Sequence, residues 1–239
     1  MGGRFLRSTT FLRQFRCFTS KKSFDICGGV WYHILTEKKR ERNLTPMKNM
    51  KLFEHELSLI KNPDLRAMTA DFMERRVPDY FWFVGASSSG KYHPVFSQGE
   101  GGLVRHTKAV VMFAEELLRM NTYGYMKDDY KDYVIVACIV HDTAKYGKYD
   151  YNKEEYADHA ENAATMFANW CKHEYDVDVS ELLVNAIKAH MGQWSTNKED
   201  KPFNGIDRCV HMADYMASRS FINIPAIVME WEELKMGDE

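Results

Sequence analysis

Hydrophobic residues recur at helical spacing along most of the chain after residue 50. Five successive segments between residues 103 and 217 each place apolar side chains three and four positions apart, which gathers them on one face of an α-helix. Two earlier segments, 52–60 and 64–77, show the same spacing, and Pro78 ends the second of them. The pattern predicts an all-α fold in which the two early helices pack against the other five as a lid or a support.

Histidine and aspartate interrupt the apolar faces of the five later helices. A single histidine in such a place is most simply a hydrogen-bonded core residue, because a buried polar group needs a partner. A buried aspartate is more costly to keep charged without a cation or a hydrogen-bond donor. When several such side chains converge from five helices, a bound divalent metal explains them better than an independent structural role for each residue. The candidate metal ligands are His106, His141, Asp142, His159, His190 and Asp214.

The donor types narrow the choice of metal. Imidazole and carboxylate donors without thiolate suit Mn²⁺, Fe²⁺, Co²⁺, Ni²⁺ or Zn²⁺. Six ligands are too many for one small ion that must also keep positions open for water and substrate, so we predict two ions. Asp142 has candidate ligands on both sides and is therefore the predicted bridge between the ions. Such a pair holds a hydroxide for attack on phosphorus and stabilises the charge on the phosphoryl oxygens.

Composition is ordinary for one globular domain. The chain has 239 residues, of which 45% are hydrophobic and 28% are charged. No run of about 18 uncharged apolar residues occurs, so we predict no membrane span. The five cysteines are scattered and form no C-x-x-C pair, which favours reduced thiols in a cytoplasmic protein over zinc ligands.

The charge changes sign near Pro46. Residues 1–46 hold ten Lys and Arg against three acids, a net +7, whereas the remaining residues hold 22 against 31, a net −9. We therefore predict a basic, disordered arm at 1–46 and a folded domain at 47–239. Residues 4–16 are rich in Arg and hydroxyl groups and lack acids, as in an organellar transit peptide, which would place the protein in mitochondria. Alternatively, the arm contacts RNA, or translation begins at Met47 or Met50.

The six candidate ligands, in their order and helical context, resemble the HD-domain superfamily of metal-dependent phosphohydrolases. His159 and His190 resemble the additional ligands of its two-metal members, which include cyclic-nucleotide phosphodiesterases and the HD domain of a bacterial 3′–5′ exoribonuclease. The amino-acid sequences of residues 89–94, 101–107 and 213–219 are similar to those of small stand-alone HD proteins of bacteria and their phages. The resemblance covers about residues 80–222 and implies a single helical HD-type domain.

The resemblance also suggests three contacts to substrate. Lys145 follows the His-Asp pair by three residues, where this superfamily often has a lysine that faces the substrate phosphate. It could instead be a solvated lysine favoured by the helix dipole. Lys91 lies in a Gly/Ser-rich loop at 85–102, which either lines the mouth of the site or is a plain connector. Arg219 could bind phosphate or pair with an acid on the surface.

The predicted activity is hydrolysis of a phosphate ester or anhydride in a nucleotide or short oligonucleotide by a metal-bound hydroxide. The net −9 outside the arm argues against binding of an extended nucleic acid, which needs clustered Lys and Arg. Two alternatives remain. One is a single-metal nucleotidase or dNTP hydrolase without His159 and His190 as ligands, and the other is a non-catalytic HD module that binds nucleotide.

Overall fold

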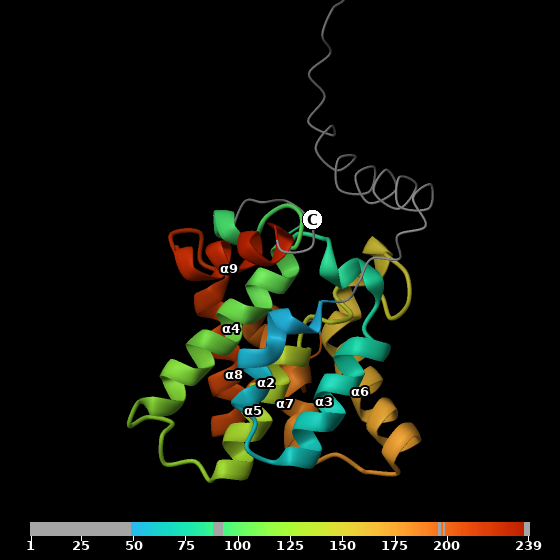
Figure 1. Cartoon of the computed structure of the whole chain (residues 1–239). Coiled ribbons are helices and arrows are strands. Elements are labelled where there is room, and N and C mark those ends of the chain that lie inside the picture. The colour runs from blue at the N-terminus through green and yellow to red at the C-terminus, as the bar shows by residue number, and fades with distance from the viewer. Residues whose placement is uncertain (1–48, 88–92, 196, 198, 237–239) are drawn as a thin grey trace, which may run out of the picture.

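The computed structural model describes residues 49–87, 93–195, 197 and 199–236, and this part of the chain folds into helices without a strand (Figure 1). The α-helices are α2 (Glu54–Ser58), α3 (Pro63–Arg75), α4 (Gly102–Arg119), α5 (Asp128–Val140), α6 (His159–Tyr175), α7 (Glu181–Lys188), α8 (Gly205–Ala217) and α9 (Pro225–Met236). Five 3₁₀ segments complete it: η1 (Met50–Phe53), η2 (Asp79–Trp82), η3 (Val95–Ser97), η4 (Lys153–Asp158) and η5 (Ala189–Trp194). The all-α prediction is confirmed, while the predicted arm lies outside the described residues.

The five later helices form the core that positions the site. Helix α4 packs against α5 and α8, while α7 contacts α5, α6 and α8. The predicted apolar faces are buried: Leu103, Val110 and Ala114 of α4 are all fully enclosed. In α8, Val210 and Ala217 are buried in the same way. Hydrophobic periodicity therefore indicated correctly which side of these helices faces inward.

The two early helices support this core. Asn62 caps α3 by accepting hydrogen bonds from the backbone amides of residues 64 and 65, and Pro63 occupies its first position. Phe72 of α3 meets Phe167 of α6 edge to face, with ring centroids 5.1 Å apart. Phe53 of η1 is also fully buried. This segment is thus part of the hydrophobic core, as a support would be.

Helix α9 was not predicted, and it explains one of the glycines before α4. Gly101 has φ +67, and a Cβ there would lie 2.1 Å from the ring of Trp231 in α9. Arg105 lies over the same ring at 5.0 Å and donates to the carbonyls of residues 96, 98 and 100. The glycine motif and Arg105 therefore fix the loop before α4 against α9.

A buried lysine joins the start of the described chain to α4 and α9. Lys108 of α4 forms ion pairs with Glu56 at 2.7 Å and with Glu230 at 3.0 Å, and it donates to the carbonyl of Leu52. Lys108 and Glu56 are each 4% exposed. The pair is therefore shielded from water. In such a buried site, loss of one partner leaves the charge of the other uncompensated.

Replacing Lys108 by Met is expected to lower the free energy of unfolding by about 3–5 kcal/mol, because the carboxylate of Glu56 stays buried without its cation. Urea denaturation measures the change. Arg119→Met is the control, since Arg119 pairs with Glu115 at the surface and such pairs contribute about 0–1 kcal/mol. Equal effects of the two substitutions would contradict a structural role for the buried pair.

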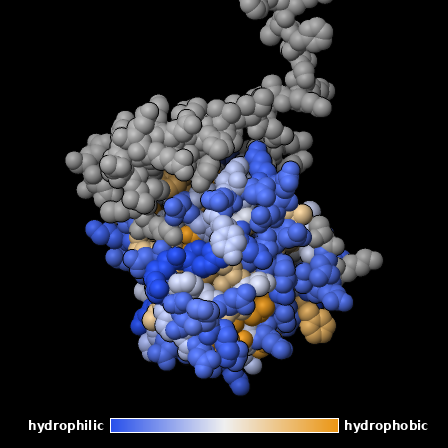
Figure 2. Space-filling model, turned by 90° about the vertical axis from the view of Figure 1, so that its right-hand side faces the viewer, coloured by the Kyte–Doolittle hydropathy of each residue, from blue (hydrophilic) through white to orange (hydrophobic). Residues whose placement is uncertain are grey.

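Among the described residues, none of the helices combines the length and the apolar character needed to cross a membrane. The face shown in Figure 2 is mostly hydrophilic, with hydrophobic residues scattered among polar ones. The buried free cysteines Cys138, Cys171 and Cys209 lie outside the possible metal-binding groups found in the described chain. These three thiols are core residues.

Candidate metal centre

All six predicted ligands lie in two buried groups. His106, His141 and Asp214 form the first group, and Asp142, His159 and His190 form the second. Within each group the candidate ligand atoms lie within 4.8 Å of one another. These are two groups that could hold metal ions, built from the ends and faces of five different helices.

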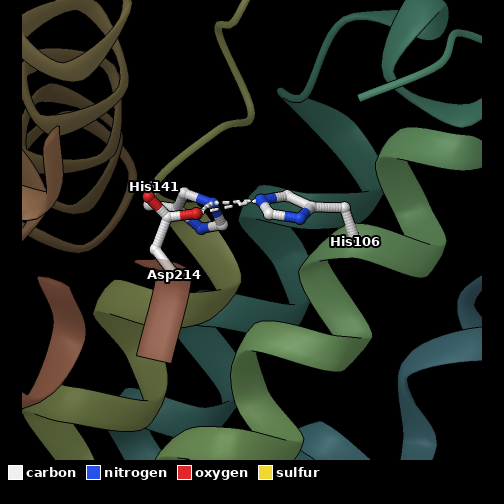
Figure 3. Close-up of side chains that lie close together, drawn as sticks. All are labelled: His106, His141 and Asp214. Carbon is white, nitrogen blue, oxygen red and sulfur yellow. Dashed lines mark hydrogen bonds and ion pairs between the residues drawn. The ribbon is translucent and has the colours of Figure 1, made fainter. Parts of the chain in front are cut away.

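The first group brings together α4, the end of α5 and α8 (Figure 3). His106 Nε2 lies 3.1 Å from Asp214 Oδ1 and 3.4 Å from His141 Nε2. The Asp214 oxygen is 3.9 Å from His141 Nε2. Both imidazoles are completely buried, whereas the side chain of Asp214 is 18% exposed. Three ligand atoms therefore face a common centre, and Asp214 lies on the side that solvent reaches.

The second group lies directly beside the first. His159 Nε2 and His190 Nε2 are 3.1 Å apart, and they lie 3.3 and 3.7 Å from Asp142 Oδ1. The other oxygen, Asp142 Oδ2, is 3.4 Å from His141 Nε2 and 3.6 Å from His106 Nε2. Asp142 thus turns one oxygen toward each group.

Backbone carbonyls orient three of the four imidazoles. The Nδ1 atoms of His141, His159 and His190 lie 2.7, 2.6 and 2.8 Å from the carbonyl oxygens three residues earlier. An Nδ1–H that donates to a carbonyl leaves the Nε2 lone pair free, which is the tautomer that ligates a metal through Nε2. His106 Nδ1 is buried and has no hydrogen-bond partner among the described residues, whereas its Nε2 lies 3.1 Å from Asp214 Oδ1.

Three candidate ligands lie at helix ends and not within helices as predicted. His141 is the residue after α5, which ends at Val140, and His159 is the first residue of α6. His190 lies in η5, because α7 ends at Lys188 and Gly192 interrupts the turn with a positive φ of 58. Tyr156, three residues before His159, is 40% exposed because it belongs to η4. Periodicity gave the direction of each ligand but not the helix boundary.

The electrostatics of the site separate the imidazoles. Burial lowers the pKa of His106, and burial together with His141 and His159 lowers the pKa of His190 to about 3. Burial also opposes a charge on His141, but Asp142 and Asp214 outweigh it and raise the pKa of that ring. His106 and His190 are therefore neutral near pH 7 and are ready to donate a lone pair to a metal.

The two carboxylates stay ionised. Burial favours the protonated form of Asp142, but Lys145 and His141 outweigh it and hold the pKa of this carboxyl well below its usual value. His106 and His141 likewise lower the pKa of Asp214 against the effect of burial. Two buried negative charges among imidazoles favour a cation at this place.

Lys145 is buried, contrary to the alternative of a solvated lysine. Its residue is 5% exposed, and its ammonium forms an ion pair with Asp142 Oδ2. Burial would lower the pKa of Lys145, but Asp142 raises it above its usual value, so the side chain is charged. It also lies 6.0 Å from the ring centroid of Tyr156. A fixed positive charge therefore lies beside the predicted bridging carboxylate.

The other predicted substrate contacts are less closely tied to the two groups. Lys91 lies outside the described residues. Arg219 donates to the carbonyl of Tyr215 and to Ser218 Oγ, and its guanidinium lies 4.1 Å from the ring centroid of Tyr215. Tyr215 stacks on Trp194, with centroids 5.7 Å apart and planes at 11°. The structure thus places Arg219 in an aromatic cluster.

Two further histidines lie near the candidate ligands. The ring of His93 is 5.5 Å from that of His106, and burial, followed by the charge of His106, lowers its pKa to about 3. His211 Nδ1 lies 2.8 Å from the carbonyl of His190, and a Cβ on Gly192 would lie 2.1 Å from the His211 ring. His211 therefore holds the segment that carries His190.

The model of the HD domain family matches residues 103–219, the segment that contains all six candidate ligands. Residues 103–219 form an HD domain. No curated protein and no solved structure matches the chain. The resemblance recognised in the sequence is confirmed, and the buried His/Asp groups of this HD domain are consistent with a metal-dependent phosphohydrolase.

The donor atoms of the HD domain fit divalent transition metals. Asp142 Oδ1 is completely buried and has no hydrogen-bond partner among the described residues, although it faces two imidazole Nε2 atoms. A buried acceptor without a donor is costly, and a cation between these atoms would remove that cost. The set of imidazole and carboxylate donors suits Mn²⁺, Fe²⁺, Co²⁺, Ni²⁺ or Zn²⁺.

We expect the metal-free HD domain to lose stability as the pH falls below about 6.5, the usual pKa of histidine. The pKa of His190 is about 3 in the folded chain, so the unfolded chain binds a proton in this interval that the folded chain excludes. Acid therefore favours unfolding until the pH reaches the folded pKa. His190→Asn keeps a donor near the place of Nδ1 but cannot titrate, so it should flatten the slope.

Urea denaturation with a chelator, at about pH 7.5 and about pH 5, measures this dependence. Each histidine can change the equilibrium constant of unfolding by at most about tenfold per pH unit. His173→Asn is the control, because His173 is exposed. An unchanged slope in His190→Asn would show that His190 accepts a proton in the folded protein.

Proposed function

We propose that the chain is a metal-dependent phosphohydrolase that uses two divalent ions to hydrolyse a phosphate ester or anhydride of a nucleotide or short oligonucleotide. The observation that carries the proposal is the position of Asp142, which turns Oδ2 toward His106 and His141 and Oδ1 toward His159 and His190. A carboxylate shared in this way suits two ions bridged by one ligand. When bound, such ions supply an activated water and neutralise the charge that develops on the phosphoryl group.

The ligands divide between the two ions. In the proposal, His106, His141 and Asp214 would hold one ion, His159 and His190 would hold the other, and Asp142 would serve both. The backbone carbonyls that fix the Nδ1 atoms keep each Nε2 directed at its ion without further reorganisation. Five of the six side chains are buried, which limits the access of bulk water and strengthens their electrostatic effect on a phosphoryl group.

Lys145 is the proposed phosphate anchor. Its ammonium is charged, buried and paired with Asp142, which itself faces both groups. A phosphate oxygen that approaches these groups would therefore meet a fixed cation. Arg219 and Lys91 are proposed as outer contacts to the substrate. In Arg219 the guanidinium keeps donors beyond those used for Tyr215 and Ser218, because this group carries five N–H bonds.

The proposed substrate is small. The net charge outside residues 1–46 is −9, which argues against a long basic surface for an extended nucleic acid. Two ions and a few basic side chains would instead hold one nucleotide or a short oligonucleotide. A cytoplasmic location, which the reduced cysteines favour, belongs to the same proposal.

A hydrolysis screen tests the activity. Nucleoside mono- and triphosphates, cyclic nucleotides and short RNA are incubated with the chain and Mn²⁺, and products are read by phosphate release and chromatography. We expect turnover with at least one class, and its loss after chelation. Metal binding without turnover of any class would favour the non-catalytic module that binds nucleotide.

A further inference from the structure

A pocket of about 470 Å³ opens beside the second group of candidate ligands. One wall is η4 with the first turn of α6, including His159, and the other is η5 followed by Ser195, Asn197 and Asp200. The volume lies within the range of roughly 300–1,000 Å³ that small-molecule sites occupy. Because His159 lines this pocket, a ligand in it would lie next to the metal centre.

Each wall presents an aromatic ring whose plane is already fixed. Tyr156 stacks on His159 with centroids 5.0 Å apart and planes at 26°. Trp194 stacks on Tyr215 in nearly parallel planes, and the Arg219 guanidinium lies 5.8 Å from the Trp194 ring. Tyr156 also stacks on Tyr146, with centroids 6.1 Å apart. Part of each side chain still reaches solvent, since Tyr156 is 40% and Trp194 is 48% exposed. A planar group that stacks here would order little additional side-chain structure.

The acidic side chains of the pocket disfavour a phosphate as its occupant. Asp158, Glu161 and Asp200 line it, and no Lys or Arg is among the described residues that do. Glu161 is engaged by Lys188 at 2.7 Å, which leaves Asp158 and Asp200 as carboxylates at the pocket for a ligand. Carboxylates accept hydrogen bonds from amino groups of bases, as Asp and Glu do from cytosine N4.

We propose that this pocket is a nucleobase subsite that packs the base against Tyr156 and Trp194 and favours bases with an exocyclic amino group through Asp158 and Asp200. The inference rests on the proposed function for the position of the phosphate, which lies at the metal groups beside Lys145. It adds the substrate class: a nucleotide of adenine, guanine or cytosine is bound in preference to one of uracil or thymine.

Nucleoside binding tests the subsite without turnover. Labelled adenosine, cytidine, uridine and ribose are equilibrated with the full chain loaded with Mn²⁺, and their affinities are measured by dialysis. We expect adenosine to bind more tightly than ribose and cytidine more tightly than uridine. Trp194→Ala and Tyr156→Ala should each weaken adenosine about tenfold, in line with the loss of one stacking ring. Trp194→Phe should retain most of the affinity.

Two controls separate the subsite from general effects. Tyr125→Ala removes an exposed aromatic ring that does not line the pocket, and it should leave nucleoside binding unchanged. The double substitution of Asp158→Asn and Asp200→Asn should remove the preference for cytidine over uridine. Metal content and circular dichroism are measured for every variant. If Trp194→Ala loses metal or fold, the affinities of Tyr156→Ala and Trp194→Phe for adenosine test the subsite.

The proposal is overturned if adenosine binds no more tightly than ribose, or if folded variants of Trp194 and Tyr156 keep full affinity. Equal affinity for cytidine and uridine overturns the preference for an amino-bearing base. These results are distinct from failure of the proposed function. A chain that shows the expected binding pattern but hydrolyses no phosphate ester retains the subsite and refutes the hydrolase.

Discussion

Replacing Asp142 by Asn is expected to reduce metal-dependent turnover by at least roughly 10³-fold. Losses of this size follow when one residue is removed from a set of catalytic residues that act together. The substitution nearly preserves volume but removes the charge from the oxygens that face both ligand groups. Both ions would lose a ligand, so the stoichiometry of bound Mn²⁺ should fall together with turnover. Elemental analysis and kinetics under saturating Mn²⁺ measure the two quantities.

The same substitution should also destabilise the metal-free protein. Lys145 is buried and pairs with Asp142, so Asp142→Asn leaves an ammonium without its partner, which costs about 3–5 kcal/mol. Adding Lys145→Met should recover part of this loss in urea denaturation without restoring turnover. Kinetics are therefore measured at a temperature where circular dichroism shows Asp142→Asn to be folded.

Asp132→Asn is the matched control for Asp142→Asn. Asp132 is also a buried aspartate, at 2% exposure, but its oxygens accept hydrogen bonds from the backbone amides of Lys61 and Asn62 at 2.8 Å. Its replacement should cost about 1–3 kcal/mol in stability and leave metal binding and turnover of the folded protein intact. If folded Asp142→Asn turned over at the rate of Asp132→Asn, the bridging role of Asp142 would be wrong.

The candidate ligands that the structure gathers into two groups could be selected from the sequence because their signal is local. A polar residue on an apolar helix face must find a partner inside the fold, so His106 and Asp214 could be assigned from periodicity alone. The pairing of ligands into two groups could not be assigned in this way, because it depends on how α4, α5 and α8 pack. The division into 1–46 and 47–239 remains a prediction.

Other features of the site depend on chain geometry that periodicity does not encode. Lys145 follows α5 within a series of turns, and the return of that segment over Tyr80 buries it: Tyr80 Oη accepts from the amide of Tyr146 and donates to the carbonyl of Gly147. His93 approaches His106 from a loop, where spacing carries no information about direction. These contacts are tertiary, and a single sequence gives no measure of them.

Replacing His190 by Asn is expected to lower the metal stoichiometry from two ions to one and to reduce turnover by about 10²-fold or more. Even the loss of a residue that only hydrogen-bonds to a metal ligand lowers metal affinity or activity by about 10–100-fold. Asn can keep a donor for the carbonyl of Ile187, which His190 Nδ1 contacts at 2.8 Å, but it lacks an atom in the place of Nε2. The fold should therefore survive while the second group loses one of its three ligand atoms.

This variant separates the two-metal proposal from the single-metal alternative. A nucleotidase or dNTP hydrolase with one ion on His106, His141, Asp142 and Asp214 would keep its ion and its rate in His190→Asn, because none of its ligands is changed. His106→Asn should abolish turnover under either mechanism, and His173→Asn, at an exposed position, should leave stoichiometry and rate unchanged. A His190→Asn protein with one ion and full turnover would therefore leave a catalytic HD domain but remove the second ion from its mechanism. Loss of both the second ion and the rate would instead place His190 and its group in the reaction, since the first group remains complete in that variant.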